Sequence, residues 1–197
     1  MSYPDYPLTE QQACLLDAYL TLMVKWNHVF NLTAITDKQA MIENHVLDSL
    51  AITPYIDKTY YIDVGSGPGL PGIPLAIFFP EKHFVLLDSN GKKTRFLQQV
   101  KALLGMGNIE IIHDRVEHYL PDHRFDGVLS RAFSDLKTML SLTKHLCHTQ
   151  GVFLAMKGQY PDQELKKINQ PFKIYPLSNS LQQKKRHLVM IENRIGE

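Results

Sequence analysis

Two acidic residues and a run of glycines are spaced so that they could hold an adenosine-containing cofactor. Residues 63–72 read DVGSGPGLPG and follow an apolar run, and Asp88 closes the next apolar run, residues 84–87. Glycines let a backbone turn sharply and approach a ligand closely, and the first amide groups of a following helix lack partners. An acid at the end of the second strand can accept hydrogen bonds from ribose hydroxyls. The pattern is typical of an α/β domain that binds such a cofactor.

The residues alone leave the kind of cofactor open. Gly67, Gly69 and Gly72 satisfy the Gly-x-Gly-x-x-Gly fingerprint of nicotinamide-binding proteins. S-adenosylmethionine has no pyrophosphate, so its binding depends more on close backbone approach and on carboxylates than on a helix dipole. Asp63 could organise the loop or reach the ammonium group of that cofactor. The two acids favour S-adenosylmethionine over a nicotinamide, and a turn without a ligand is the third interpretation.

The composition is that of a globular chain with no strong overall charge. The 197 residues are 44% hydrophobic, and 21 basic against 20 acidic residues give a net charge of +1, so nucleic-acid binding would depend on a local basic face. The two cysteines, Cys14 and Cys147, form no CxxC pair, which favours a reducing compartment over a disulfide framework. No window approaches the ~18 apolar residues of a membrane span. We expect a cytoplasmic protein without membrane contact.

The first 58 residues predict a helical extension. Thr9 with Gln12 matches a capping box, and a helical apolar pattern follows to Phe30. Thr36 with Gln39 repeats the signature before a second helical pattern, which stops at Pro54. We expect this extension to pack on a single domain over residues 59–197.

From residue 60, short apolar runs alternate with helical patterns, which predicts a mostly parallel sheet covered by helices on both faces. The expected strands are residues 60–64, 83–87, 109–113, 125–129, 151–156, 172–175 and 187–192. The expected helices are residues 71–79, 92–104, 135–147 and 163–167. The helix over 135–147 would carry His145 and Cys147, with His148 just beyond, but successive positions diverge by about 100° and no fourth ligand is evident, so we predict no metal site.

Several segments together resemble a known family, the bacterial 16S ribosomal RNA guanine-N7 methyltransferases, once called glucose-inhibited division protein B. The segments are residues 25–33 (KWNHVFNLT), 45–49 (HVLDS), 63–74 (DVGSGPGLPGIP), 86–93 (LLDSNGKK), 130–133 (SRAF) and 186–189 (RHLV). The resemblance implies a Rossmann-like class I methyltransferase fold, with a seven-stranded, mostly parallel sheet whose last strand is antiparallel. It also implies methylation of N7 of the guanine at position 527, in the 530 loop of 16S RNA.

The resemblance also implies site residues. Cofactor contacts carry over to Gly65, Leu70, Asp88, Val116, Glu117 and Arg131, and the loop pattern adds Gly67. Only the family match makes His45 a substrate candidate, because its spacing from Asp48 by itself favours a satisfied surface pair or a pair between helices. Basic clusters at Lys92, Lys93 and Arg95 and at residues 184–186, including Arg186, could meet RNA phosphates or be solvated surface charge. Asn44, before His45, and the segment 173–185 depart from the family pattern.

The chemistry that follows from guanine N7 needs no general base. N7 bears a lone pair and no proton, so methylation would be an in-line displacement that rests on alignment and electrostatics. We therefore predict no catalytic base. Because positive charge passes to the purine, Arg131 is better suited to a phosphate, a carbonyl oxygen or an acidic neighbour. The target guanine must be unpaired or exposed, since side chains cannot read the narrow major groove of A-form RNA.

Two other functions remain open at this point. A nicotinamide-dependent oxidoreductase would use the fingerprint of Gly67, Gly69 and Gly72. A ribosome assembly factor could have kept the fold and the basic clusters without the activity. For the methyltransferase and for the assembly factor, the expected partner is the small ribosomal subunit. We expect the protein to be a monomer.

Overall fold

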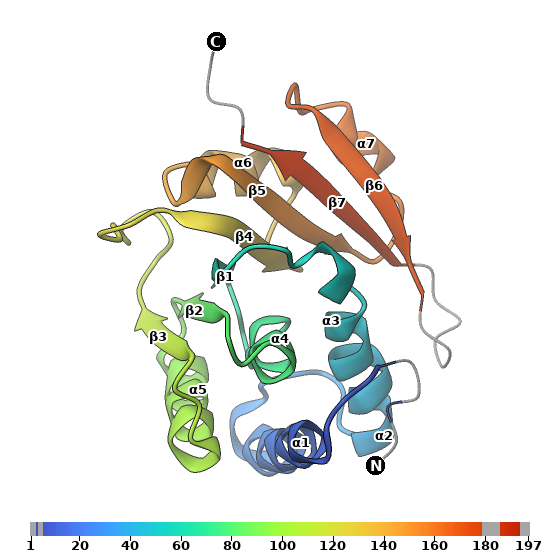
Figure 1. Cartoon of the computed structure of the whole chain (residues 1–197), viewed down its shortest axis with the longest axis vertical. Coiled ribbons are helices and arrows are strands. Elements are labelled where there is room, and N and C mark those ends of the chain that lie inside the picture. The colour runs from blue at the N-terminus through green and yellow to red at the C-terminus, as the bar shows by residue number, and fades with distance from the viewer. Residues whose placement is uncertain (1–2, 4–5, 179–185, 194–197) are drawn as a thin grey trace.

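A seven-stranded sheet forms the centre of the computed structural model, which describes residues 3, 6–178 and 186–193 (Figure 1). The strand order is β3-β2-β1-β4-β5-β7-β6. The strands are β1 (Tyr60–Val64), β2 (His83–Asp88), β3 (Ile109–His113), β4 (Phe125–Arg131), β5 (Cys147–Lys157), β6 (Phe172–Leu177) and β7 (Arg186–Glu192).

All neighbouring strands from β3 to β5 pair in parallel, whereas β7 runs antiparallel to both β5 and β6. The predicted α/β class, with its antiparallel last strand, is therefore confirmed. The chain starts at β1 in the middle of the sheet, winds outward to β3 and then returns to β4 on the other side of β1. In open α/β sheets, ligands bind outside the carboxyl ends of the strands at such a switch point. In this sheet the switch point lies between the carboxyl ends of β1 and β4.

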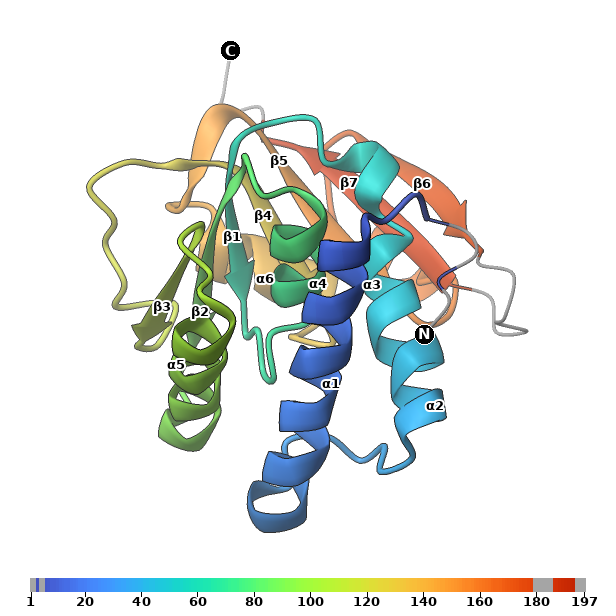
Figure 2. The same ribbon diagram turned by 60° about the horizontal axis from the view of Figure 1, so that its bottom comes forward.

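Helices cover both faces of the sheet and bury two separate apolar clusters (Figures 1 and 2). One face carries α1 (Glu10–Phe30), α2 (Lys38–Met41), a π-helix η1 (Ile42–Leu47), α3 (Asp48–Leu50), α4 (Gly72–Phe78) and α5 (Gly91–Leu104). The other face carries α6 (Leu136–Thr143) and α7 (Asp162–Leu165), and a 3-10 turn η2 (Thr53–Tyr55) leads from α3 toward β1.

The first helix begins as the sequence predicts and is attached to the sheet domain by polar contacts. The backbone N–H of Gln12 donates to the Thr9 hydroxyl at 3.2 Å, and that of Thr9 donates to Gln12 Oε1 at 2.9 Å, which completes the capping box. Gln12 Nε2 also donates to the carbonyls of Ile77 and Phe78, at the end of α4, at 3.0 and 2.9 Å. The same side chain thus caps α1 and joins it to α4.

The second helix starts one residue later than predicted. Asp37, and not Thr36, is its N-cap, and the Asp37 carboxylate accepts the N–H of Ala40 at 2.7 Å. Asp and Thr are both good N-caps, and here the extended backbone of Asp37 places its carboxylate over the first turn.

The predicted helix over 135–147 was wrong at its end. It ends at Thr143, and Cys147 and His148 lie in β5. The backbone N–H of Phe125 donates to the carbonyl of Leu146 at 2.8 Å, which pairs the chain after α6 with β4. His145, Cys147 and His148 therefore do not share a helix.

Candidate functional site

The glycine loop leaves β1 at the switch point with three left-handed glycines. Gly65, Gly67 and Gly69 have φ of 66°, 59° and 98°, a region that other residues rarely adopt. The N–H groups of Gly65 and Ser66 both donate to the carbonyl of Leu87, at 2.8 and 3.1 Å, so the loop stays joined to the end of β2. A Cβ at Gly65 would lie 2.6 Å from a ring carbon of Phe133. Only glycine lets the backbone and this ring approach so closely.

Asp63 is buried beneath the glycine loop and holds its end by a hydrogen bond. Its side chain is fully buried, and Oδ2 accepts the N–H of Gly72, the first residue of α4, at 2.9 Å. Among the described residues, Oδ1 has no hydrogen-bond partner. Burial raises the pKa of this carboxyl to about 7, opposed by the hydrogen bond from Gly72, while the nearby Asp88 raises it further and Arg131 lowers it. The loop thus rests on a carboxyl that is about half protonated at pH 7.

This arrangement leaves the start of α4 without a free amide for a phosphate. The N–H of Gly72 goes to Asp63, and that of Ile73 donates to the carbonyl of Gly69 at 2.7 Å. Pro71 and Pro74 have no N–H to offer. A helix N-terminus binds pyrophosphate through such amides. The Gly67-x-Gly69-x-x-Gly72 fingerprint is therefore present here without the donor set that a dinucleotide needs.

Asp88 ends β2 and faces the loop. Its Oδ2 accepts the N–H of Gly67 at 2.8 Å, and Oδ1 accepts the N–H of Asn90 at 2.8 Å. A carboxylate has about four acceptor positions, two on each oxygen. Each oxygen of Asp88 therefore keeps an acceptor position while both are held in place by the backbone.

A cavity of about 440 Å³ opens beside Asp88 at the carboxyl ends of the strands. It is lined by residues from the glycine loop, the ends of β2 and β4, the start of α5 and the segment after β3: Gly65, Leu87, Asp88, Ser89, Lys93, Asp114, Arg115, Val116, Glu117, Ala132, Phe133, Ser134 and Leu142. We call this the loop cavity. Its close backbone approach at Gly65 and the spare acceptors of Asp88 fit the sugar of an adenosine-containing cofactor.

The predicted cofactor residues fall into two groups. Gly65, Asp88, Val116 and Glu117 line the loop cavity together. Gly67 does not line it but binds Asp88 through its N–H, Leu70 is buried in the core under the loop, and Arg131 lies on another cavity. The contacts of these residues with a cofactor stay predictions.

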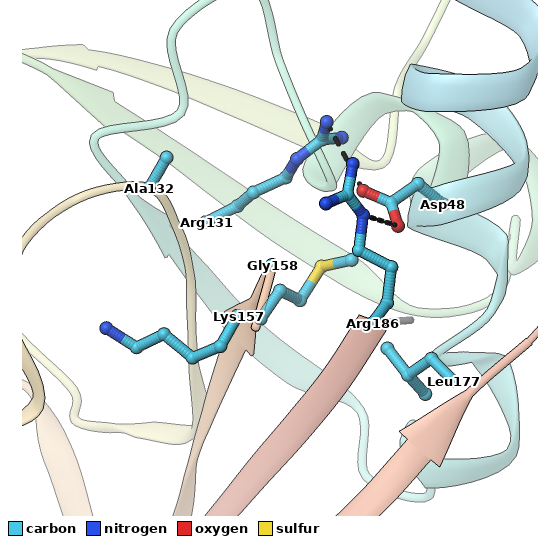
Figure 3. A pocket seen from close by; sticks show the side chains of 8 residues that line it. Asp48, Arg131, Ala132, Lys157, Gly158, Leu177 and Arg186 are labelled. Atoms are coloured by element: carbon cyan, nitrogen blue, oxygen red, sulfur yellow. Dashed lines mark hydrogen bonds and ion pairs between the residues drawn. The ribbon is translucent and has the colours of Figure 1, made fainter. Parts of the chain in front are cut away.

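Arg131 lines a second cavity of about 250 Å³, which we call the arginine cavity. Figure 3 shows Arg131 and Arg186 converging on Asp48, while Lys157 points away. Arg131 Nη2 lies 3.3 Å from one oxygen of Asp48, and Arg186 Nε lies 3.2 Å from the other. Lys157 instead pairs with Glu164 at 2.7 Å. Two arginines share one buried carboxylate, so the cavity holds one positive charge in excess.

The two cavities meet at Ala132, which lines both. Ala132 has a φ of 53°, a left-handed conformation that is costly for a residue with a Cβ. It follows directly on β4, so the strand end turns Arg131 into one cavity and Phe133 into the other. Backbone outliers of this kind gather at functional sites.

His45 is buried in the π-helix η1 and lines neither cavity. Its Nε2 lies 2.8 Å from the hydroxyl of Thr33, and its Nδ1 lies 3.0 Å from the carbonyl of Asn44 and 3.3 Å from Arg131 Nη2. Burial, then the charge of Arg131, lower the pKa of His45 to about 4, so the ring is neutral at pH 7. Its contact with substrate stays a prediction.

The other predicted substrate residues lie on two elements, α5 and β7. Lys92 and Arg95 are exposed on the first turn of α5, and Lys93 reaches the loop cavity. Arg186 faces the arginine cavity, whereas Lys184 and Lys185 lie outside the described residues. Residues 3, 6–178 and 186–193 contain no group of three or more His, Cys, Asp or Glu placed to hold a metal ion. No helix within the same ranges is long and apolar enough to cross a membrane.

Two features of the site are not predicted from the sequence. The sequence suggests Asp48 as a partner of His45 by spacing, but in the structure Asp48 pairs with Arg131 and Arg186. The sequence marks Phe133 only as part of the family segment SRAF. Its position after the fourth strand is the feature that could have placed it at the site. Neither the π-helix nor the arginine pair has a local sequence pattern that predicts it.

Curated relatives and one solved structure place these features in context. The chain is 56% identical over 160 residues to a ribosomal RNA small subunit methyltransferase G of Legionella pneumophila, covering 81% of this chain and 76% of the relative. It is 51% identical over 170 residues to the protein of the same name in Stutzerimonas stutzeri, covering 85% and 79%.

The fold is similar to that of M. jannaschii TYW2 solved in complex with AdoMet, with a TM-score of 0.56, 16% identity and coverage of 81% of this chain and 78% of that one. At this identity the likeness concerns the fold alone. The family model described as rRNA small subunit methyltransferase G matches residues 12–189. This chain therefore belongs to the rRNA small subunit methyltransferase G family.

Proposed function

We propose that this protein transfers a methyl group from S-adenosylmethionine to N7 of a guanine in 16S ribosomal RNA, the guanine at position 527 in the 530 loop. The observation that carries the proposal is the meeting of two cavities at Ala132, one with a ribose acceptor and one with excess positive charge. Membership of a family of small-subunit rRNA methyltransferases supports it. We further propose that the protein acts in the cytoplasm as a monomer.

The loop cavity is the proposed cofactor site. Asp88 would accept the ribose hydroxyls, Gly65 would bring its backbone against the ligand, and Val116 and Glu117 would flank the adenine. Gly67 and Leu70 would act by shaping the loop. S-adenosylmethionine supplies, when bound, a methyl group on a sulfonium sulfur.

Arg131 is proposed to hold the carboxylate of the cofactor's amino-acid end. Its guanidinium is close enough to Asp63 and to Asp48 for their charges to act on it. A guanidinium binds a carboxylate well because its donors form a planar fork. Arg131 would not stabilise the purine directly, because the purine becomes positively charged on methylation.

The arginine cavity and the basic rim are the proposed RNA side. Arg186 donates one N–H to Asp48, and among the described residues its two other nitrogens make no hydrogen bond or ion pair. Lys92, Lys93 and Arg95 lie near the start of α5, and Lys93 lines the loop cavity. Such groups bind phosphates of an RNA strand largely without regard to sequence.

The chain's own residues would align the reacting atoms and need not move a proton. Guanine N7 has a free lone pair, so no residue has to act as a general base. The neutral state of His45 at pH 7 is in keeping with a structural ring. Rate enhancement would come from orientation in the two cavities and from exclusion of water.

An oxidoreductase with a nicotinamide cofactor is less well supported, because the first amides of α4 are already used by Asp63 and Gly69 or are absent at the prolines. The direct test is transfer of labelled methyl from S-adenosylmethionine to small subunits, and separately to naked 16S RNA, from cells that lack this protein. Label recovered as 7-methylguanosine is the expected result. Binding of subunits without incorporation of label would favour the assembly-factor hypothesis instead.

A further inference from the structure

The segment 25–33, KWNHVFNLT, lines neither the loop cavity nor the arginine cavity. It nevertheless lies at the same end of the molecule as the glycine loop. In Figure 2 the carboxyl end of β1, the loop after it and the end of α1 all point toward the bottom of the view. The last turn of α1 carries Asn27, which is buried, and α1 closes at Asn31 in a left-handed conformation. Any effect of this segment on the two cavities would therefore pass through intermediate residues.

Asn27 fixes the loop that follows α1. Its Oδ1 accepts the N–H of Thr33 at 2.8 Å, and its Nδ2 donates to the carbonyl of Ile35 at 3.3 Å. The N–H of Ile35 in turn donates to the hydroxyl of Thr33 at 3.2 Å. A buried side-chain amide with both ends engaged leaves the Thr33 side chain little freedom.

Thr33 connects this loop to the π-helix. Its hydroxyl lies 2.8 Å from Nε2 of His45, and the opposite ring nitrogen, Nδ1, lies 3.3 Å from Arg131 Nη2. Hydrogen bonds therefore link Asn27, Thr33 and His45 in sequence and bring the ring against the guanidinium.

The π-helix itself supplies the rest of the support. Arg131 Nη2 donates to the carbonyl of Asn44 at 2.6 Å, and Nη1 lies at 3.5 Å from the carbonyl of His45. The wide π-turn over Ile42–Leu47 presents these carbonyls to a side chain that comes from β4. Single π-turns in otherwise α-helical segments are frequent at functional sites.

We propose that Asn27 and Thr33 are positioning residues, which hold the His45 ring and the π-turn so that the Arg131 guanidinium is fixed in the arginine cavity, next to Ala132. The proposal rests on the function proposed above, in which Arg131 binds the cofactor. The neutral His45 ring does not repel the guanidinium, in keeping with the low pKa of this histidine. Thr33 and Asn27 touch no reacting atom and act through Arg131.

The first test is the affinity for S-adenosylhomocysteine, measured by titration calorimetry without RNA. Thr33→Val keeps the shape of the side chain and removes the hydroxyl, and we expect the Kd to rise about three- to tenfold, the effect of one lost hydrogen bond. Thr33→Ser restores the hydroxyl and should bind within about twofold of the unchanged protein. Thr36→Val makes the same change at an exposed site of the same loop and serves as the matched control.

A double-mutant cycle separates positioning from a purely structural effect. In an Arg131→Gln background, Thr33→Val should cause no further loss of affinity, because the group it positions is gone. Additive losses in the double variant, or an unchanged Kd in Thr33→Val itself, would overturn the proposal. Thermal unfolding of each variant ensures that affinities are compared well below the melting temperature.

The same experiment keeps this proposal apart from the proposed function. If the unchanged protein binds S-adenosylhomocysteine and methylates RNA while Thr33→Val binds equally well, only the positioning role fails. If the unchanged protein does not bind S-adenosylhomocysteine, the cofactor assignment fails, and the positioning proposal fails with it.

Discussion

Asp63 and Asp88 end neighbouring parallel strands, yet the protein gives these two carboxylates different surroundings. Asp63 is buried under the loop, one of its oxygens has no hydrogen-bond partner in the described part of the chain, and burial raises its pKa to about 7. Asp88 borders the loop cavity and receives one backbone N–H on each oxygen. One acid therefore supports the backbone, and the other remains available to a ligand.

Asp88→Asn should weaken binding of S-adenosylhomocysteine at least about tenfold, because a charged acceptor of hydroxyl groups is replaced by an amide with half its acceptor capacity. Titration calorimetry measures this directly. Asp122→Asn, on an exposed turn, is the matched control and should bind like the unchanged protein. Equal affinity in Asp88→Asn would argue against the proposed ribose contact.

Asp63 predicts a pH dependence of stability. Its pKa in the folded protein, about 7, exceeds the ordinary 3.8, so the folded state holds the proton more tightly than the unfolded state. The stabilisation from this proton is fully present below about pH 4 and is lost as the pH rises through about 7.

Replacing Asp63 by Asn tests that dependence, since the amide keeps an acceptor for Gly72 and does not titrate. Between pH 4.5 and 6.5, the free energy of unfolding of the unchanged protein should fall relative to that of Asp63→Asn by about 1.4 kcal/mol per pH unit. Urea unfolding at several pH values gives the difference. Parallel curves for the two proteins would contradict a raised pKa.

At the scale of elements, most strands and helices follow from local pattern. The strands predicted at 60–64 and 109–113 have those bounds. The first is buried along nearly all its length, whereas the second lies at the edge of the sheet and buries only Ile109. The predicted end of the helix over 135–147 was wrong because its last residues fit a helical pattern locally. In the structure, the hydrogen bond between Phe125 and Leu146 joins the chain there to the sheet. Local pattern does not record such a pairing.

The start of α2 offers a prediction at this scale. Asp37→Ala should lower the free energy of unfolding by about 1 kcal/mol, because the N–H of Ala40 loses its acceptor. Thr36→Ala should cost much less, as Thr36 lies outside the helix and is exposed. Urea unfolding of the two variants decides between the two caps. A larger loss in Thr36→Ala would restore the cap that the sequence alone indicates.

At the scale of the whole molecule, the extension and the sheet domain share one apolar cluster. Tyr19 and Met23 of α1 are buried in the same cluster as Phe84 of β2 and Phe96 of α5. The Tyr19 hydroxyl also donates to the carbonyl of Pro68 in the glycine loop at 2.7 Å. We propose that residues 1–58 are an extension of the domain 59–197 and that the two unfold together.

The single tryptophan can report on this unfolding. The ring of Trp26 in α1 lies 5.6 Å from that of Phe96 in α5, centre to centre, so its fluorescence senses the contact between extension and domain. We expect the urea transition followed by Trp26 fluorescence to coincide with that followed by far-ultraviolet circular dichroism. A fluorescence transition at lower urea would mean that the extension separates first.

The sequence by itself determined the order of strands and helices, the glycine turn and the two acids, because apolar periodicity, caps and glycines act over a few residues. The tertiary structure alone decided that Asp48 joins Arg131 and Arg186, the last of which is 138 residues away. It also decided that Ala132 borders two cavities and that a π-turn meets Arg131. These contacts depend on sheet order and on how the extension packs, which only the complete set of long-range contacts fixes.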